Sequence, residues 1–464
     1  MERISDMRKK IDKVDEKIVY SIKKRMSLCN KIGAIKREKG VPVRDFERED
    51  EKYKQVMKRA LKLGLNPHEV RSIYEKIVSM SINTQEVTLP NATSSVRPSP
   101  DRNAKGESML YEMAETVVKL ENEGKKIIKF NVGDPDQQTP PEIVNALLKA
   151  LKKGKTKYAS SAGEKELKEE LAYVHEVSPK NVVITTGSKW AIFSIIYLLL
   201  KKDENIVVIS PHWTAYKTIA ETLGVTTRYL NTTVDSNWKI DAARLENLID
   251  KNTRLLILNN PNNPTGKVIE SKTLEDVVHI ANSKQLKILS DEVYSDLSLV
   301  KTKSVLDFDG GHMIVNSFSK TFAMTGWRVG YAIVDDELAG KMFKLNQSTL
   351  TNVPIFIQDA ALKALKLKDR IAKKMRGIYR RRAELACKIL SRTKLKFTKP
   401  DAPFYVFPRR ENLNSESLAF SLLEQGIAIT PGTSFGNYRE HFRIALSVPE
   451  KEIELGLKKL CEAL

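Results

Sequence analysis

One lysine lies among groups that can bind phosphate in the segment 317–328, Ser-Phe-Ser-Lys-Thr-Phe-Ala-Met-Thr-Gly-Trp-Arg. The amine of Lys320 can react with an aldehyde. The hydroxyls of Ser317 and Ser319 and the guanidinium of Arg328 can hold a phosphate through charge-assisted hydrogen bonds. The preceding run, Met-Ile-Val-Asn, predicts a strand. These residue types indicate a pyridoxal phosphate site, and a surface lysine beside a helix start is the alternative.

Polar residues follow five apolar, β-rich runs in the second part of the chain. Because the carboxyl ends of parallel strands meet at one edge of an open α/β sheet, these polar segments can converge on one site. The runs and the segments that follow them are 182–184 with 186–189, 206–209 with 210–213, 255–258 with 260–266, 288–289 with 291–294, and 313–316 with 317–319. Their alternation with helical stretches predicts an α/β domain with a largely parallel sheet.

The 464 residues divide by composition into two parts. Residues 1–85 have helical periodicity and almost no strand signal. Residues 86–106 are polar and contain several Ser, Thr and Pro, so we expect a linker there. The α/β part follows at 107–464.

Composition argues against several classes of protein. Three scattered cysteines, Cys29, Cys387 and Cys461, fit neither a disulfide framework nor a zinc cluster, so we expect a reducing compartment and no metal centre. The first residues are charged, and no apolar run approaches the roughly 20 residues of a membrane span, so we expect a cytoplasmic protein without a membrane partner. The net charge of +20 permits anionic partners, and residues 1–90 are the more basic part by density.

Residues 107–464 resemble, with their motifs in family order, a fold-type I, class I aminotransferase of the aspartate aminotransferase superfamily. The resemblance implies that Lys320 holds pyridoxal phosphate covalently and then acts as the base that moves the substrate's proton. It also implies two domains, which we expect at about 130–345 for the large cofactor-binding domain and at 107–129 and 346–464 for the small α+β domain.

Four residues match positions around the cofactor's ring in this family. Asp291 matches the aspartate that pairs with the pyridinium nitrogen, where a buried carboxylate keeps that nitrogen protonated. Asn263 and Tyr294 match the pair that hydrogen-bonds the ring oxygen, and Trp213 matches the aromatic ring that stacks on the pyridine. From local sequence alone, Asp291 could equally be a helix N-cap and Trp213 a core residue.

Other residues match positions around the phosphate. Gly187 allows close backbone approach, and Ser188 and Lys189 open a helix whose amino end suits an anion. Tyr158 matches a tyrosine that the family sends across a dimer interface to the phosphate. This match implies an obligate homodimer or a larger homo-oligomer.

The substrate's α-carboxylate is expected at Arg443, which matches a bidentate arginine, and beside the backbone of Gly133. Lys189 matches a lysine that related aspartate and prephenate aminotransferases use for a second carboxylate. However, the segment 107–109 departs from the Ser-Thr segment of those relatives, and Trp190 is bulkier than their usual polar residue. The acceptor therefore stays open between prephenate, phenylpyruvate, 4-hydroxyphenylpyruvate and oxaloacetate.

The first predicted helix carries an apolar seam with 3-4 spacing, which favours a partner helix. Its residues are Ile4, Met7, Ile11, Val14 and Ile18. Arg25 falls on the extended seam, and Lys36 lies about 20° away on the same face. Cations on a buried seam need an anion. Arg8 is turned by about 100° from Arg25 and could reach such a pocket only from another chain.

Two further helices are predicted in this part. Gly40 and Pro42 end the first helix, Asp45 starts a second, and the segment 66–69 resembles a capping box that opens a third. A three-helix bundle with solvated charges is the plain alternative to an anion site.

Residues 1–85 resemble the all-helical class of chorismate mutases over their full length. Eight residues fall on that family's active-site positions: Arg8, Arg25, Lys36, Asp45, Arg48, Glu49, Ser81 and Gln85. The resemblance implies an all-α three-helix domain and an entwined dimer, in which Arg8 completes the partner's pocket. The substrate, chorismate, is a dianion that rearranges to prephenate without covalent catalysis, so position and charge decide the rate.

The resemblance also implies roles for these residues. Arg8, Arg25 and Lys36 would hold the two carboxylates, with Arg48 and Ser81 in support. Glu49 and Asp45 would orient the ring hydroxyl. Lys36 and Gln85 would donate to the ether oxygen as negative charge grows on it.

We therefore expect a bifunctional enzyme that makes prephenate and transaminates a 2-oxo acid of the same pathway, with glutamate or aspartate as donor. One alternative is an aspartate aminotransferase whose helical domain dimerises or senses chorismate. A transcription regulator is the other alternative. Residues 1–90 lack a winged helix-turn-helix pattern and direct their cations to a seam, so we expect no nucleic-acid partner.

Overall fold

The computed structural model describes residues 2–38, 46–67, 70, 73, 74, 76–78, 81 and 115–464. Two compact units make up the chain, residues 1–98 and 99–464. The division between them falls within the stretch 86–106 that composition predicts to be a linker, and that stretch lies outside the described residues.

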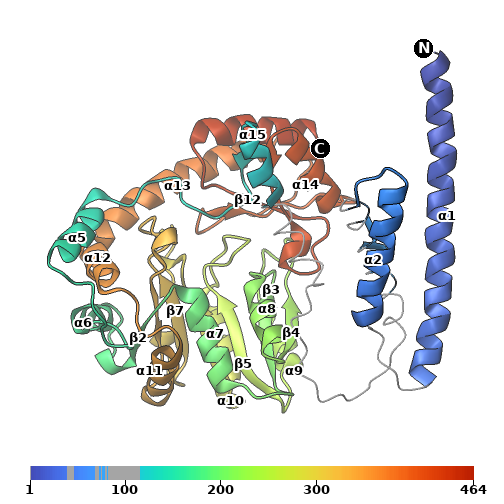
Figure 1. Ribbon diagram of the computed structural model, residues 1–464. Helices are drawn as coiled ribbons and strands as arrows, with labels where there is room; N and C mark the ends of the chain where they lie inside the picture. The colour runs from blue at the N-terminus through green and yellow to red at the C-terminus, as the bar shows by residue number, and fades with distance from the viewer. Residues whose placement is uncertain are drawn as a thin grey trace. The chain divides into compact units, whose positions relative to one another are not determined.

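The first unit is helical in its described residues. It contains α1 (Glu2–Glu38) and α2 (Phe46–Lys62), and helical residues recur between positions 67 and 81 (Figure 1). Along α1 the seam residues Met7, Ile11, Val14 and Ile18 are each more than half exposed. The described residues therefore leave these four apolar side chains of α1 largely uncovered.

The second unit is built on a seven-stranded sheet with the order β2-β8-β7-β6-β5-β3-β4. The strands are β2 (Val182–Thr185), β3 (Asn205–Ser210), β4 (Thr226–Asn231), β5 (Thr253–Asn259), β6 (Lys287–Asp291), β7 (Met313–Ser317) and β8 (Gly330–Ile333). All neighbours run parallel except β8, which is antiparallel to β2 and β7. The sheet is thus mixed, since β8 returns beside β7 without a crossover helix.

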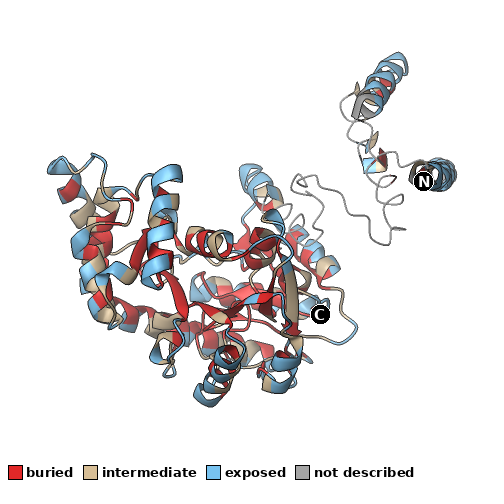
Figure 2. Ribbon diagram, turned by 90° about the horizontal axis from the view of Figure 1, so that it is seen from below, coloured by how far each residue is buried: buried red, intermediate tan, exposed pale blue. Residues whose placement is uncertain are grey.

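Helices cover both faces of this sheet (Figure 1). Val182 and Ile184 of β2 pack into one core cluster and Val183 into the other, as strand geometry requires. The first cluster includes α6 (Lys165–Val174), α9 (Ala242–Leu248), α10 (Ser271–Ser283) and α12 (Ile355–Lys366), and the second includes α7 (Ser188–Leu199), α8 (Ala215–Thr222) and α11 (Asp336–Thr349). The strands are mostly buried as a result (Figure 2), which explains their continuous apolar runs.

A smaller α+β part of this unit has its own core. Its strands are β1 (Ile128–Lys129), β9 (Tyr405–Val406), β10 (Ile427–Ala428), β11 (Thr430–Pro431) and β12 (Phe442–Ala445), and its helices are α13 (Lys368–Leu390), α14 (Ser415–Glu424) and α15 (Glu450–Glu462). Residues 115–122 are also helical, and Val117 among them packs in a cluster with Ile127, Leu423 and Ala428. Helix α5 (Pro141–Lys152) packs against α12. Among the described helices, none combines the length and the apolar character that a membrane crossing needs.

Candidate active site

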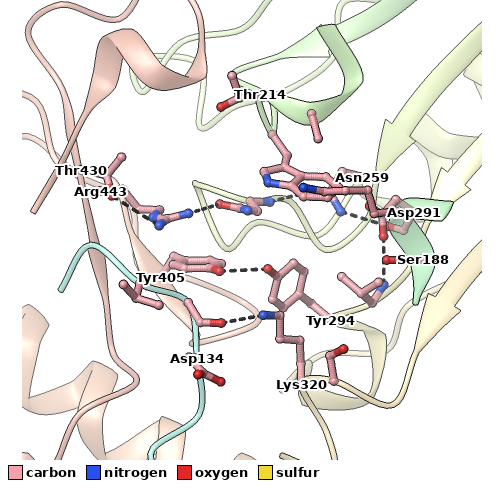
Figure 3. Close-up of a pocket in the computed structure, with 18 of the residues that line it drawn as sticks. Asp134, Ser188, Thr214, Asn259, Asp291, Tyr294, Lys320, Tyr405, Thr430 and Arg443 are labelled. Carbon is pink, nitrogen blue, oxygen red and sulfur yellow. Dashed lines mark hydrogen bonds between the residues drawn. The ribbon is translucent and has the colours of Figure 1, made fainter. Parts of the chain in front are cut away.

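A cavity of about 490 Å³ lies where the strands of the large sheet end, and the polar segments predicted to converge do meet there (Figure 3). Twelve of the residues predicted for the cofactor or substrate line it: Gly133, Ser188, Lys189, Trp213, Asn263, Asp291, Tyr294, Ser317, Ser319, Lys320, Arg328 and Arg443. Gly187 is the N-cap residue of α7, directly before Ser188, which lines the cavity.

Lys320 follows β7 and extends its amine into the cavity. Its Nζ donates a hydrogen bond of 2.5 Å to the carbonyl oxygen of Gly133. Burial, together with the nearby cations Arg443 and Arg328, lowers the pKa of Lys320 to about 8. A neutral, nucleophilic amine is therefore accessible close to neutral pH.

Asp291 is the last residue of β6 and is almost fully buried. Its Oδ2 accepts a 2.7 Å hydrogen bond from the hydroxyl of Tyr216, and its Oδ1 accepts one of 3.3 Å from the backbone N–H of Val293. Burial raises the pKa of Asp291 to about 6. A cationic partner inside the cavity would favour the ionised carboxylate.

The turn before α7 makes close contact with Arg328. Gly187 has a φ of +78°, and a Cβ built on it would lie 2.6 Å from Nη2 of Arg328. Ser317 and Ser319 are buried and line the same cavity. The backbone N–H of Ser319 donates to Oγ of Ser317 over 3.3 Å. Hydroxyls, a guanidinium and the amino end of α7 together form a cradle that suits a phosphate.

Arg443, on β12, is held at the opposite side of the cavity (Figure 3). Its Nη1 donates to Oδ1 of Asn263 over 3.0 Å, and its Nη2 donates to the carbonyl oxygen of Asn131 over 2.7 Å and to Oγ1 of Thr430 over 3.3 Å. Its Nε is buried and has no hydrogen-bond partner among the described residues. The guanidinium is thus oriented by the protein with capacity left for a carboxylate.

Two aromatic rings flank this guanidinium. Its centre lies 4.5 Å from the ring centroid of Tyr405 and 5.0 Å from that of Phe435. The hydroxyls of Tyr405 and Tyr294 are hydrogen-bonded at 2.9 Å. A Cβ on Gly133 would collide with the hydroxyl of Tyr405, which explains the need for glycine there.

Lys189 and Trp213 form one wall, with Nζ of Lys189 lying 5.0 Å from the centroid of the indole. Trp190 instead donates from Nε1 to Oδ1 of Asn346 over 2.8 Å and stacks on Phe193. Its indole is therefore engaged outside the residues that line the cavity, so its bulk takes no room from a substrate.

Tyr158 does not line this cavity, and its exposed fraction is 88%. In a single chain it therefore makes no contribution to the site.

In the first unit, Arg25 and Ser81 are brought together. Nη1 of Arg25 contacts Oγ of Ser81 and donates to the carbonyl oxygen of Ile77 over 3.2 Å. Lys36 is half-buried, and Arg8 and Arg48 are exposed. Asp45 and Gln85 lie outside the described residues, as does the side chain of Glu49.

Sequence reasoning missed several cavity residues. Asn259 ends β5 directly before the predicted polar segment, so the rule that sites form at strand ends could have found it. Tyr216, Thr430, Tyr405 and Phe435 also line the cavity. Tyr216 lies on α8, and the other three come from the smaller part, where no strand-end pattern marks them.

Residues 125–460 match the family model for class I and II aminotransferases, which is most of the chain. The chain belongs to this family. Residues 7–86 match the model for chorismate mutase type II. The chain is therefore an enzyme that combines an isomerase domain with a transferase domain.

Relatives and solved structures agree with this assignment. An aspartate aminotransferase of Thermococcus kodakarensis is 34% identical over 74% of this chain and 90% of that protein. An aspartate/prephenate aminotransferase of Thermus thermophilus is 30% identical over 75% of this chain and 93% of that protein. The crystal structure of an aromatic aminotransferase from Pyrococcus horikoshii is 30% identical and superposes with a TM-score of 0.71, over 76% of this chain and 98% of that one.

This family implies pyridoxal phosphate, and the cavity fits it. The cradle around Gly187 suits the phosphate, and the buried carboxylate of Asp291 suits a protonated ring nitrogen. Asn263 and Tyr294 are both buried at the cavity and could hold a ring oxygen.

Proposed function

We propose that the chain converts chorismate to prephenate in its first domain and transaminates a 2-oxo acid of the same pathway in its second, with glutamate or aspartate as amino donor. The observation that carries the second half is the placing of Lys320, Asp291 and Arg443 around one cavity. The chorismate mutase match in the same chain supports the choice of pathway.

In the transferase domain, pyridoxal phosphate when bound would serve as an electron sink that makes the proton on the substrate's Cα acidic. Arg443 binds the α-carboxylate and so fixes which face of Cα meets Lys320. The amine of Lys320, with its pKa lowered to about 8, would be the base that moves that proton between Cα and C4′ of the cofactor. The carboxylate of Asp291 would keep the ring nitrogen of the cofactor protonated.

In the mutase domain, Arg25 and Lys36 hold the carboxylates of chorismate in the compact conformer. The contact between Arg25 and Ser81 supports this role because it fixes the direction of the guanidinium. Gln85 and Lys36 donate to the ether oxygen, which becomes more negative as its bond to carbon breaks.

Two dimer contacts belong to this proposal. The exposed seam of α1 is apolar over several turns, so a second copy would bury it. Arg8 and Tyr158 are both exposed in the single chain, and each would complete a site of the partner subunit.

The relatives leave a second candidate, an aspartate aminotransferase whose helical domain only dimerises or senses chorismate. The name of the Thermococcus protein favours it, whereas the name of the Thermus protein includes prephenate. We favour prephenate or an aromatic 2-oxo acid because the mutase match lies in the same chain. Lys189 lies beside Trp213 on the cavity wall and could pair with a second carboxylate of prephenate.

Separation of the two activities tests the proposal. Arg25→Ala should lower the mutase rate by about 100-fold or more, because a buried carboxylate contact is lost, and leave transamination unchanged. Lys320→Ala should do the reverse, lowering transamination by roughly 10²–10⁴-fold. Lys24→Ala removes an exposed cation one residue from Arg25 and serves as control. Wild-type protein without mutase activity would leave only the second candidate.

A further inference from the structure

A second cavity, of about 410 Å³, lies beside the first and shares Asn259 with it. The segment that follows β5 forms the wall between them, because Asn263 lines the first cavity while Asn262 and Thr265 line the second. Asn262 fixes this wall by donating from Nδ2 to the carbonyl oxygen of Pro211 over 3.1 Å. A cavity of this size can hold a small organic molecule.

Apolar side chains make up much of its lining: Ile209, Ile240, Val268, Ile269 and Val300. The charged residues that line it are Lys239, Lys267, Lys301, Glu270 and Asp401. Apolar walls with a few charged groups are the usual composition of a site for an amphiphilic small molecule.

The charges favour an anion. Lys267 and Asp401 already form an ion pair of 2.8 Å, and Asp401 also accepts from the backbone N–H of Val268. Lys239 and Lys301 are exposed, and neither has an ion-pair partner among the described residues. Glu270 is the one remaining acid of the lining, so the cavity keeps an excess of positive charge.

One wall is held in an unfavourable backbone conformation. Asn237 and Trp238 have φ values of 52° and 62°, a left-handed region that costs non-glycine residues roughly 1–3 kcal/mol each. Trp238 is anchored there by its backbone N–H, which donates to the carbonyl oxygen of Thr233, and by its indole, which donates to Oγ1 of Thr398 over 3.0 Å. The wall is therefore shaped by the protein before any ligand arrives.

Continuous contacts lead from this cavity to Arg443. Asn259 accepts a hydrogen bond of 2.6 Å from the backbone N–H of Asn263, whose side chain accepts from Arg443. On the other side, aromatic rings connect the cavity to Arg443. The ring of Trp238 lies 5.7 Å from that of Phe407, and the ring of Phe407 lies 5.6 Å from that of Phe435. Phe435 in turn flanks the guanidinium of Arg443. A molecule that displaces either wall would thus change how Arg443 is held.

We propose that this second cavity binds a small carboxylic acid with an apolar, ring-sized body, and that its occupancy alters the grip of Arg443 on the substrate. The carboxylate lies between Lys239 and Lys301, and the apolar body lies against Ile240 and Ile269. The binding free energy comes from buried apolar area and from two charge-assisted contacts.

Titration of the holoenzyme with 3-phenylpropanoate tests the proposal, because this acid has neither an amino nor a keto group and cannot be turned over. We expect the double variant Lys239→Ala/Lys301→Ala to lower the affinity for 3-phenylpropanoate at least tenfold. Ser271→Trp, which fills the cavity, should independently lower it by as much. The control, Lys202→Ala/Lys251→Ala, removes two exposed lysines that line neither cavity. Turnover without probe should be normal in both double-alanine variants.

A second readout is the KM for the amino donor. The probe should change this KM in wild type and control, and the change should shrink at least threefold in Lys239→Ala/Lys301→Ala. Equal probe binding and equal KM changes in all variants would mean that the probe occupies the active site only, and would overturn the proposal.

Discussion

Nη1 of Arg443 donates a hydrogen bond of 3.0 Å to Oδ1 of Asn263. The arginine that is expected to bind the substrate's carboxylate therefore touches the asparagine that is expected to bind the cofactor's ring oxygen. If both residues have these roles, one hydrogen bond between two buried side chains would link substrate binding to the electronic state of the cofactor.

Arg443→Lys should raise the KM for the amino donor and lower kcat/KM by about 10–100-fold, since one charge-assisted hydrogen bond contributes roughly 1.5–3 kcal/mol. Steady-state kinetics at saturating cofactor measures the change. Arg409→Lys is a matched control, because Arg409 pairs with Glu440 outside both cavities and its replacement should alter kcat/KM less than twofold. An unchanged KM in Arg443→Lys would remove Arg443 from the carboxylate site.

Gly187→Ala should lower the affinity for pyridoxal phosphate at least tenfold, because the new methyl group would push Arg328 away from the phosphate cradle. Gly154→Ala is the matched control. Gly154 has a similar φ of +71°, but nothing lies within 4 Å of its Cβ position. Both variants should lose roughly 1–3 kcal/mol of folding stability from backbone strain at a positive φ, yet only Gly187→Ala should lose cofactor affinity. Equal cofactor affinities of the two variants would mean that the phosphate does not bind beside Gly187.

Cofactor uptake by the apoenzyme should depend on the protonation of Lys320. Its pKa is lowered to about 8, so the neutral amine dominates above that pH and the ammonium below it. We therefore expect the rate of uptake, followed by absorbance, to rise with pH and to level off above about 9, roughly one unit above this pKa. A rate that keeps rising to pH 10 would show that the cavity does not lower this pKa.

The mutase rate should be nearly flat from about pH 5 to 8, because an amide at Gln85 needs no proton to donate to the ether oxygen. Gln85→Glu should make the rate fall as pH rises above the ordinary glutamic acid pKa of about 4.3, since the ionised carboxylate cannot donate. Initial rates of chorismate loss across this range would decide. A steep fall above pH 6 in wild type contradicts the role of Gln85.

Much of the transferase fold could be predicted because strands buried on both faces leave unmistakable apolar runs, and their ends mark the site. Ser317 and Asp291 end β7 and β6 in this way. The antiparallel strand β8 was not predicted, since an apolar run carries no sign of direction. Tyr405 and Phe435 were missed because they reach Arg443 through long-range packing in the smaller part.

In the first unit, four residues of the predicted seam lie on α1 and are exposed, so the partner helix expected for them stays a prediction. Arg25 and Ser81, 56 positions apart, are in contact. Only the resemblance to all-helical chorismate mutases implied that they belong to one site. The turn of Trp190 toward Asn346 could not be read from sequence, because a residue's type does not tell which face of a buried helix it occupies.

We propose that one chain makes prephenate and aminates an acid of the same pathway. Incubation of the holoenzyme with chorismate and ¹⁵N-glutamate, or ¹⁵N-aspartate, tests this proposal, with phenylpyruvate, 4-hydroxyphenylpyruvate, oxaloacetate and 2-oxoglutarate supplied in parallel reactions and products identified by mass. We expect chorismate to be consumed and ¹⁵N to appear in the amino acid formed from prephenate or from one of the two aromatic acids. Unconsumed chorismate, or ¹⁵N transferred only to oxaloacetate or 2-oxoglutarate, would contradict it.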